Sequence, residues 1–216
     1  MAHTDDISPE ALDDVARQIA DLVERGIETR LEVESALPDE VKGENEFEQP
    51  TPLTIGDSFR ICKLKASALQ NIRDGKAVGD LSEWVEQSDL FFHLILSHGK
   101  PKAFARSVWP LKDATEESLY QLNVSSLPEL VGQAVETIKQ NKERDPVLNG
   151  DPVVRLLEIP SYQLISLWLY DECLGESRVL TVLSPERYAK LQPEQLLDTE
   201  TFFAGLREQP PLQGIA

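Results

Sequence analysis

The chain has few of the groups that commit a protein to a known chemistry. It holds only two cysteines, Cys62 and Cys173, which form neither a CxxC pair nor a zinc-type spacing with a histidine. We therefore expect two reduced thiols and no metal site. Glycine-rich nucleotide loops, HExxH and GxSxG are absent too. Their absence disfavours the common enzyme classes and predicts no bound cofactor.

Positive charge is scarce. Lys and Arg number 21 against 38 Asp and Glu, which gives a formal net charge of −17. Nucleic acid and anionic membrane surfaces repel such a chain, and no run of basic residues offsets the repulsion. We expect neither as a partner, whereas the basic surface of another protein stays open. The sequence leaves the oligomeric state undetermined.

Long apolar runs are absent as well. Stretches such as 167–170 are much too short to span a bilayer. The first residues, Met-Ala-His-Thr-Asp-Asp, lack the basic and apolar regions of a signal peptide, so we expect a cytoplasmic protein. Apolar residues make up 41% of the chain and charged residues 27%, which is ordinary for a folded domain.

The charge is concentrated near the N-terminus and suggests three parts. Residues 1–52 carry 15 acids and 4 bases, a net charge of −11. They predict an acidic region with a helix over 9–25, a strand over 27–33 (or a continued helix), and a Glu- and Pro-containing linker over 38–53. Residues 53–209 predict the main domain, and 210–216 a loose tail.

The helix over 9–25 has two different faces. Apolar side chains recur on one face with helical spacing, at Leu12, Val15, Ala16, Ile19, Leu22 and Val23. Such a stripe needs burial, and we expect it to pack on the main domain. The opposite face then presents Asp14, Asp21 and Glu24 as candidate contacts for a basic partner.

The main domain reads as an α+β fold. Strand patterns cover 58–64, 90–97, 102–109, 119–124, 153–159, 162–170 and 178–183, with a hairpin turn at 97–100. The clearest helix covers 128–143, and two more begin near 184 and 199. Short connections between successive strands predict a mainly antiparallel sheet with helices packed on one face and helices at both ends of the chain. No internal repeat is evident in the sequence.

Polar and aromatic residues on strand patterns are the candidate site. His93 lies in a strand that is apolar on both faces, where a buried imidazole is either a satisfied core group or part of a pocket. Arg106 and Arg155 alternate with apolar residues, so each needs a carboxylate partner, a ligand or solvent. Three aromatic residues share one side of a strand at Tyr162, Trp168 and Tyr170, as in ordinary core or the floor of a ligand site.

One short segment resembles a known family. Residues 99–110, Gly-Lys-Pro-Lys-Ala-Phe-Ala-Arg-Ser-Val-Trp-Pro, resemble the hairpin strand of chorismate pyruvate-lyase-like proteins. In that family an arginine-bearing strand lies beside a pocket for a small acid. The resemblance covers this segment alone, so it transfers no catalytic residue to this chain.

Three functions remain open. The first is a non-catalytic interaction or accessory protein that binds another protein through its acidic surface. The second is a small-molecule-binding enzyme with a pocket near His93, Arg106 and Trp168. The third is an acidic mimic of nucleic acid. The missing motifs and the concentrated acidic region favour the first, so the sequence leans against an enzyme.

Overall fold

The computed structural model describes residues 53–76, 81–109, 119–123 and 125–209, together with helical positions at 10, 11, 13–15, 17, 18 and 21. The strands are β1 (Leu53–Leu64), β2 (Val85–Ser97), β3 (Lys100–Val108), β4 (Leu119–Asn123), β5 (Val153–Ile159), β6 (Leu164–Asp171), β7 (Glu176–Leu183) and β8 (Leu196–Asp198). The helices are α2 (Ala66–Arg73), α3 (Leu81–Trp84), α4 (Leu127–Asn141), α5 (Pro146–Asn149) and α6 (Thr199–Arg207), with a 3-10 turn η2 (Pro160–Tyr162).

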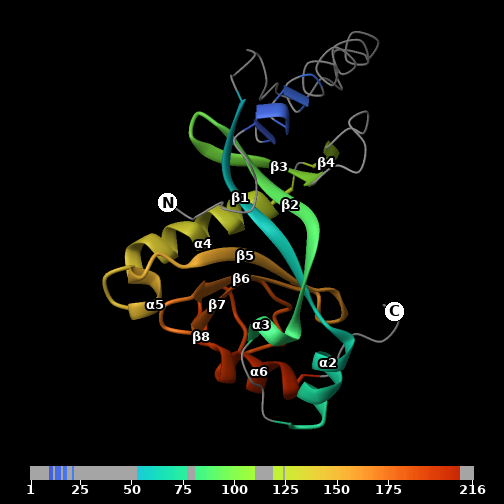
Figure 1. The fold of residues 1–216 in the computed structure, drawn as a ribbon, viewed down its shortest axis with the longest axis vertical. Helices are drawn as coiled ribbons and strands as arrows, with labels where there is room; N and C mark the ends of the chain where they lie inside the picture. Colours follow the sequence, from blue (N-terminus) through green and yellow to red (C-terminus); the bar gives the residue numbers. More distant parts are fainter. Residues whose placement is uncertain are drawn as a thin grey trace, which may run out of the picture.

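All eight strands form one sheet in the order β4-β3-β2-β1-β5-β6-β7-β8 (Figure 1). Neighbouring strands are antiparallel except β1 and β5, which are parallel. The predicted α+β class with a mainly antiparallel sheet is confirmed. Each half of the sheet is a four-stranded meander followed by a helix: β1–β4 then α4, and β5–β8 then α6. The first strands of the two meanders meet in the middle.

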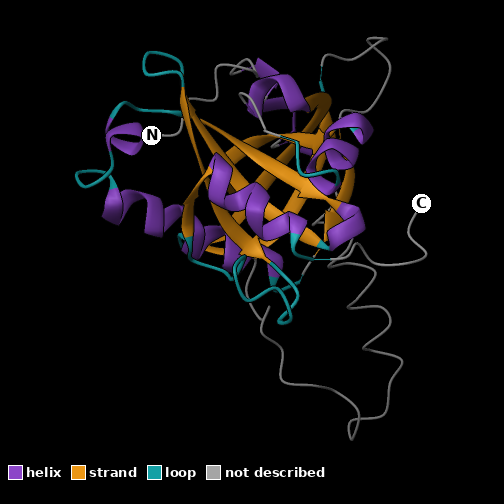
Figure 2. Cartoon of the chain, turned by 90° about the horizontal axis from the view of Figure 1, so that it is seen from below, coloured by secondary structure: helices purple, strands orange, loops and turns teal. Residues whose placement is uncertain are grey.

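The two faces of the sheet are covered by different helices. Helix α4 contributes Val131 and Ala134 to a cluster that contains Leu156 of β5. Helix α6 contributes Phe202 to a second cluster, which contains Leu157. Successive strand residues point to opposite faces, so these clusters lie on opposite sides of the sheet, called here the α4 face and the α6 face. The prediction that helices pack on one face is therefore wrong (Figures 1 and 2).

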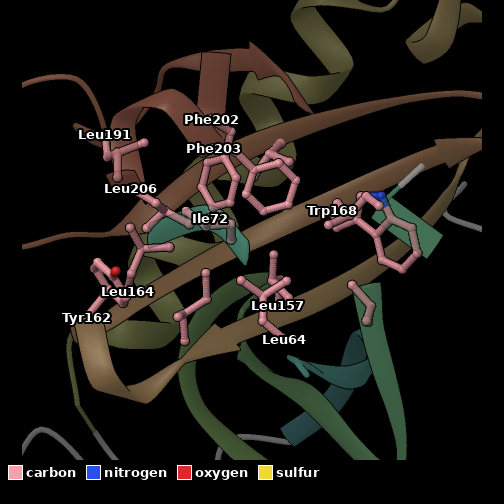
Figure 3. Close-up of a cluster of buried hydrophobic side chains, with 14 of the residues drawn as sticks. Leu64, Ile72, Leu157, Tyr162, Leu164, Trp168, Leu191, Phe202, Phe203 and Leu206 are labelled. Atoms are coloured by element: carbon pink, nitrogen blue, oxygen red, sulfur yellow. The ribbon is translucent and has the colours of Figure 1, made fainter. Parts of the chain in front are cut away.

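The cluster on the α6 face collects side chains from distant parts of the chain (Figure 3). Ile72 of α2, Leu81 of α3 and Phe203 of α6 all pack there. Because β2–β4 and β5–β8 lie between α3 and α6 in the sequence, the cluster ties distant parts of the domain together. Arg207 adds a polar tie, since its Nε donates to the carbonyl oxygen of Ile72 at 3.1 Å.

Local sequence signals explain the best-defined turns. The β2–β3 hairpin turns at His98 and Gly99, which have φ values of 52° and 73°. Two consecutive residues at positive φ match the right-handed twist of the flanking strands, so the predicted hairpin is confirmed. Asp198 begins α6 by accepting a hydrogen bond from the backbone N–H of Thr201 at 2.7 Å. The Thr201 N–H is the main reason that the pKa of Asp198 lies below its usual value, and the Thr201 hydroxyl and the charge of Arg178 lower it further.

One sequence expectation is wrong, and three others lie wholly or almost wholly outside the described residues. The helix expected near 184 is absent, because residues 184–195 form turns that anchor Tyr188 and Leu191 in the core. Of the linker expected over 38–53, only Leu53 is described, and it begins β1. The strand expected over 27–33 and the tail over 210–216 lie outside the described residues. Both cysteines are free thiols, as expected, with Cys62 buried and Cys173 exposed.

Helix α4 approaches the β2–β3 hairpin closely at one glycine. A methyl group placed on Gly132 would lie 2.6 Å from Cγ of Pro101 in β3. A proline ring has little freedom to move aside, so the absence of a side chain at this position sets how near the helix lies to the sheet.

We predict that Gly132→Ala destabilises the domain by about 1–3 kcal/mol, as overpacking does. The sign is diagnostic, because alanine inside a helix is otherwise favoured over glycine by about 1 kcal/mol. Urea unfolding measures the effect, and Gln133→Ala at the next, exposed position serves as the control. A Gly132→Ala protein more stable than the wild type would show that α4 does not pack on Pro101.

Candidate functional site

Four side chains form a row across the middle of the α6 face. In the strand register, Phe91 of β2 lies opposite Arg60 of β1. Arg60 in turn lies beside Arg155 of β5, and Arg155 lies opposite Trp168 of β6. Laterally paired residues point to the same face of a sheet, so the four side chains are neighbours. We call them the arginine–aromatic row.

Both arginines in this row stack on an aromatic ring. The guanidinium carbon of Arg60 lies 5.2 Å from the ring centroid of Phe91, and that of Arg155 lies 5.2 Å from the ring of Trp168. Both distances fall within the range of a favourable cation–π contact. Phe91 and Trp168 are buried, with exposed fractions of 2% and 1%, whereas the two arginines are half-buried. The row therefore places two cationic groups against two buried aromatic rings.

Neighbouring groups fix the orientation of the row. The indole N–H of Trp168 donates to the Ser177 hydroxyl at 3.0 Å, which holds the ring in place. Arg60 donates from Nη1 to Oε1 of Gln87 at 3.1 Å. Tyr170 is half-buried beside Trp168, with ring centroids 6.0 Å apart. Stacking on a ring constrains the plane of each guanidinium group.

His93 lies in the first meander on the same face and is completely buried. Its Nδ1 is 2.8 Å from the Ser58 hydroxyl of β1, and its Nε2 is 2.7 Å from the Ser107 hydroxyl of β3. A neutral imidazole has one donor and one acceptor nitrogen, so one serine donates and the other accepts. Burial lowers the pKa of His93 from 6.5 to about 4. The histidine is a satisfied core group that links three strands.

Arg106 lies on the opposite side of the sheet from His93. It packs near Phe104, whose ring belongs to the cluster on the α4 face. Its Nη2 donates to Oε1 of Glu158 at 2.5 Å, and both side chains are largely shielded from solvent. This ion pair is the first of the three alternatives that the sequence left open for Arg106, a carboxylate partner from the protein. It also means that Arg106 shares no pocket with His93 or Trp168.

Tyr162 belongs to the interior. Its residue is completely buried, and its ring packs beside Tyr188, with centroids 6.2 Å apart. Tyr162 and Trp168 lie at opposite ends of the cluster on the α6 face (Figure 3). The structure thus brings together three of the six candidates, Arg155, Trp168 and Tyr170. It adds Arg60 of β1 and Phe91 of β2. The sequence analysis did not include them, because no pattern within a single strand shows that β1 pairs with β5.

The described part of the N-terminal helix packs over the first meander on the α6 face. Ala11 is buried against Phe91 and Trp109, and Val15 is buried against Ile95 and its neighbours. The exposed positions of this helix are Glu10, Asp13, Arg17 and Asp21. Asp14 is half-buried and contacts Arg17 at 3.5 Å and Gln18 at 2.8 Å, whereas Glu24 lies outside the described residues.

An apolar groove of about 470 Å³ lies where β5 and β7 end and β6 begins. Its apolar lining comes from Pro160, Leu164, Ile165, Leu183 and Pro185. Leu183 is 40% exposed, which makes the groove an apolar patch on the surface of the domain. The rest of its lining includes Glu158, the partner of Arg106.

Metal-ligating clusters and long apolar helices are both absent from the described residues. Among them, no group of three or more His, Cys, Asp or Glu side chains is placed to hold a metal ion. None of the described helices is both long and apolar enough to cross a membrane.

We predict that His93 makes the domain acid-sensitive. The unfolded chain binds a proton at this residue near pH 6.5, whereas the folded protein does so only near pH 4. The free energy of unfolding therefore falls as the pH drops through this window, by about 3 kcal/mol, and the effect is complete below pH 4.

Urea unfolding between pH 7.5 and 4 measures this dependence. His93→Gln should lower the free energy of unfolding at every pH. It should also make the fall of this free energy with pH less steep, because one proton fewer is taken up on unfolding. His98→Asn, in the exposed turn, should leave the slope unchanged. Equal slopes for wild type and His93→Gln would contradict the buried, neutral imidazole.

Comparison with known proteins adds no relative. No family model matches the chain, and neither a curated protein nor a solved structure matches it.

Proposed function

We propose that this protein is a non-catalytic interaction protein that binds a basic partner protein through the acidic outer face of its N-terminal helix. One observation carries the proposal. The helix is fixed to the sheet by Ala11 and Val15, while Glu10, Asp13 and Asp21 stay exposed on its other side.

Contacts with distant parts of the chain hold the helix in a defined position. Besides the two apolar contacts, Oε1 of Gln18 accepts a hydrogen bond from the backbone N–H of Leu119 at 2.8 Å. Leu119 begins the edge strand β4, so the helix also covers the end of the first meander. A surface that is already ordered loses little conformational freedom when it binds, and this favours its use in recognition.

The charge of the chain supports the same surface. Residues 1–52 carry a net charge of −11, and the rest of the chain carries −6. A concentrated negative field speeds encounter with a basic surface and selects against acidic ones. Because the outer carboxylates are exposed, the attraction should weaken as salt is added.

The positions of the candidate catalytic residues favour a binding function over a catalytic one. His93 is enclosed between two serines, and Arg106 is engaged by Glu158. Neither is left at a solvent-filled pocket where a substrate could reach it. The apolar groove near Leu183 gives a second surface that a protein partner could cover.

We predict that neutralising the acidic face weakens partner binding. The partner is captured from the native host, identified by mass spectrometry, purified and titrated. Changing Glu10 to Gln and Asp13 and Asp21 to Asn should raise its Kd by about tenfold at low salt, since each exposed charge contributes roughly 0.2–1 kcal/mol. The difference should vanish at high salt. A matched variant neutralises three exposed acids elsewhere, at Glu143, Glu172 and Glu186. Equal losses in both variants would contradict a specific acidic face.

We further predict that Val15→Asp acts through the fold. A carboxylate at this buried position should lower the free energy of unfolding by a few kcal/mol and weaken binding along with it. Thermal unfolding and the same titration measure both effects. If the melting temperature is unchanged and only self-association is lost, the helix packs between copies of the chain and the proposed surface is wrong.

A further inference from the structure

A groove of about 750 Å³ lies between helix α4 and the β2–β3 hairpin (Figure 1). We call it the α4 groove. Its apolar lining includes Leu94 and Leu96 of β2 and Val135 of α4. On the helix side the lining extends from Glu129 to Gln140, a length of about 16 Å at 1.5 Å per residue. An extended peptide rises about 3.3 Å per residue, so the groove accommodates about five residues.

Two β-bulges shape the strand side of the α4 groove. In β1, Gly56 and Asp57 lie opposite the single residue Leu94 of β2. In β3, Lys102 is an extra residue between the two pairs that its neighbours form with β2. A bulge changes the direction of the side chains at the irregular position. Asp57 and Lys102 both line the groove, so the bulges contribute one charge of each sign to it.

The strand wall of the groove carries a net positive charge, because Lys100 and Lys102 outnumber Asp57. Both lysines are exposed, and neither ammonium group forms a hydrogen bond or an ion pair with any residue that the structure describes. With respect to the described residues, the two ammonium groups are therefore open to the acceptors of a ligand.

The helix wall carries a net negative charge, because Glu129 and Glu136 outnumber Lys139. The hydrogen bond from Nζ of Lys139 to Oε1 of Glu136, at 2.7 Å, raises the pKa of Lys139, and the charge of Asp57 raises it further. Glu129 is exposed, and its carboxylate has no partner among the described residues. Glu194, which follows β7, adds one more carboxylate to the lining.

Walls of opposite charge favour a particular pattern of side chains. In an extended chain, successive side chains point in opposite directions. A segment that lies along the groove therefore directs every second residue to the strand wall and the others to the helix wall. Acidic residues in the first set and basic residues in the second are attracted on both sides, whereas a run of one charge is repelled by one wall.

We propose that the α4 groove binds an extended segment of a partner protein in which acidic and basic residues alternate around an apolar residue. The acidic residues bind Lys100 and Lys102, and the basic residues bind the carboxylates of the helix wall. The apolar residue packs on the leucines of β2. This site goes beyond the proposed binding of a basic protein, because none of its residues belongs to the N-terminal helix. Each of the two proposals can therefore fail without the other.

The test uses the full chain and two fluorescein-labelled peptides of identical composition. The alternating peptide is Glu-Lys-Leu-Lys-Glu, and the block peptide is Glu-Glu-Leu-Lys-Lys, both amidated at the C-terminus. Fluorescence anisotropy follows each titration at pH 7.5 and low salt. The alternating peptide should bind in a saturable way and at least about fivefold more tightly than the block peptide, a difference of about 1 kcal/mol.

Variants locate the peptide in the groove. Lys100→Glu combined with Lys102→Glu should weaken binding of the alternating peptide by at least about tenfold, because repulsion replaces attraction at two positions. Glu129→Gln should weaken it by about two- to fivefold. The matched control is Lys63→Glu combined with Lys190→Glu, which makes the same change in net charge at exposed positions outside the groove and should leave the affinity unchanged. Circular dichroism verifies that each variant is folded.

Four results would overturn the proposal. The first is equal affinity for the alternating and the block peptide, or no saturable binding of either. The second is a control variant that loses as much affinity as the Lys100→Glu, Lys102→Glu protein. The third is a folded Lys100→Glu, Lys102→Glu protein that keeps the wild-type affinity. The fourth is a dimer in sedimentation velocity that these two changes dissociate, since a second copy of the chain would then occupy the groove.

Discussion

The parallel pairing of β1 with β5 is the contact on which the rest of the structure depends. It is the one parallel pair among the described strands, and it joins two antiparallel meanders into a single sheet. Residues 60–63 pair in ascending order with residues 155–158. Without this pairing each meander would keep its local hairpins but lose its core contacts with the other half, since both hydrophobic clusters take side chains from both halves.

The same pairing decides which polar groups become neighbours. Side chains of successive residues alternate between the faces, so a register shift of one residue would move Arg155 from the α6 face to the α4 face. In the observed register Arg155 joins Arg60 and stacks on Trp168, while Glu158 points to the other face and meets Arg106. Two arginines that look alike in the sequence thus lie on opposite faces: Arg155 stacks on Trp168 beside Arg60, and Arg106 packs near Phe104 and forms an ion pair with Glu158.

Local signals in the sequence were sufficient for many elements. The turn at His98 and Gly99 was readable because few residue pairs accept positive φ, and α4 was readable because its apolar residues recur with helical spacing. The expectation of a helix near 184 was wrong. Ser184 and Pro185 resemble a helix start, but the apolar residues that follow serve as single anchors in turns, where Tyr188 and Leu191 enter the core.

The candidate site was predictable only in part, for a physical reason. Alternation within one strand correctly placed Trp168 and Tyr170 on one side, because that depends on the strand alone. It could not show that Arg60 lies beside Arg155, since the two are 95 positions apart and their adjacency depends on long-range pairing. Arg106 was grouped with His93 for the same reason, although the two belong to opposite faces.

The central claim is therefore the ascending register of β1 against β5, and nuclear Overhauser contacts between backbone protons test it most directly. In uniformly labelled protein, contacts should link 60 with 155, 61 with 156, 62 with 157 and 63 with 158, within one residue. Contacts that run in descending order, or that place β5 beside any strand other than β1 and β6, would contradict the account. Either result would separate Arg60 from Arg155 and dissolve the arginine–aromatic row.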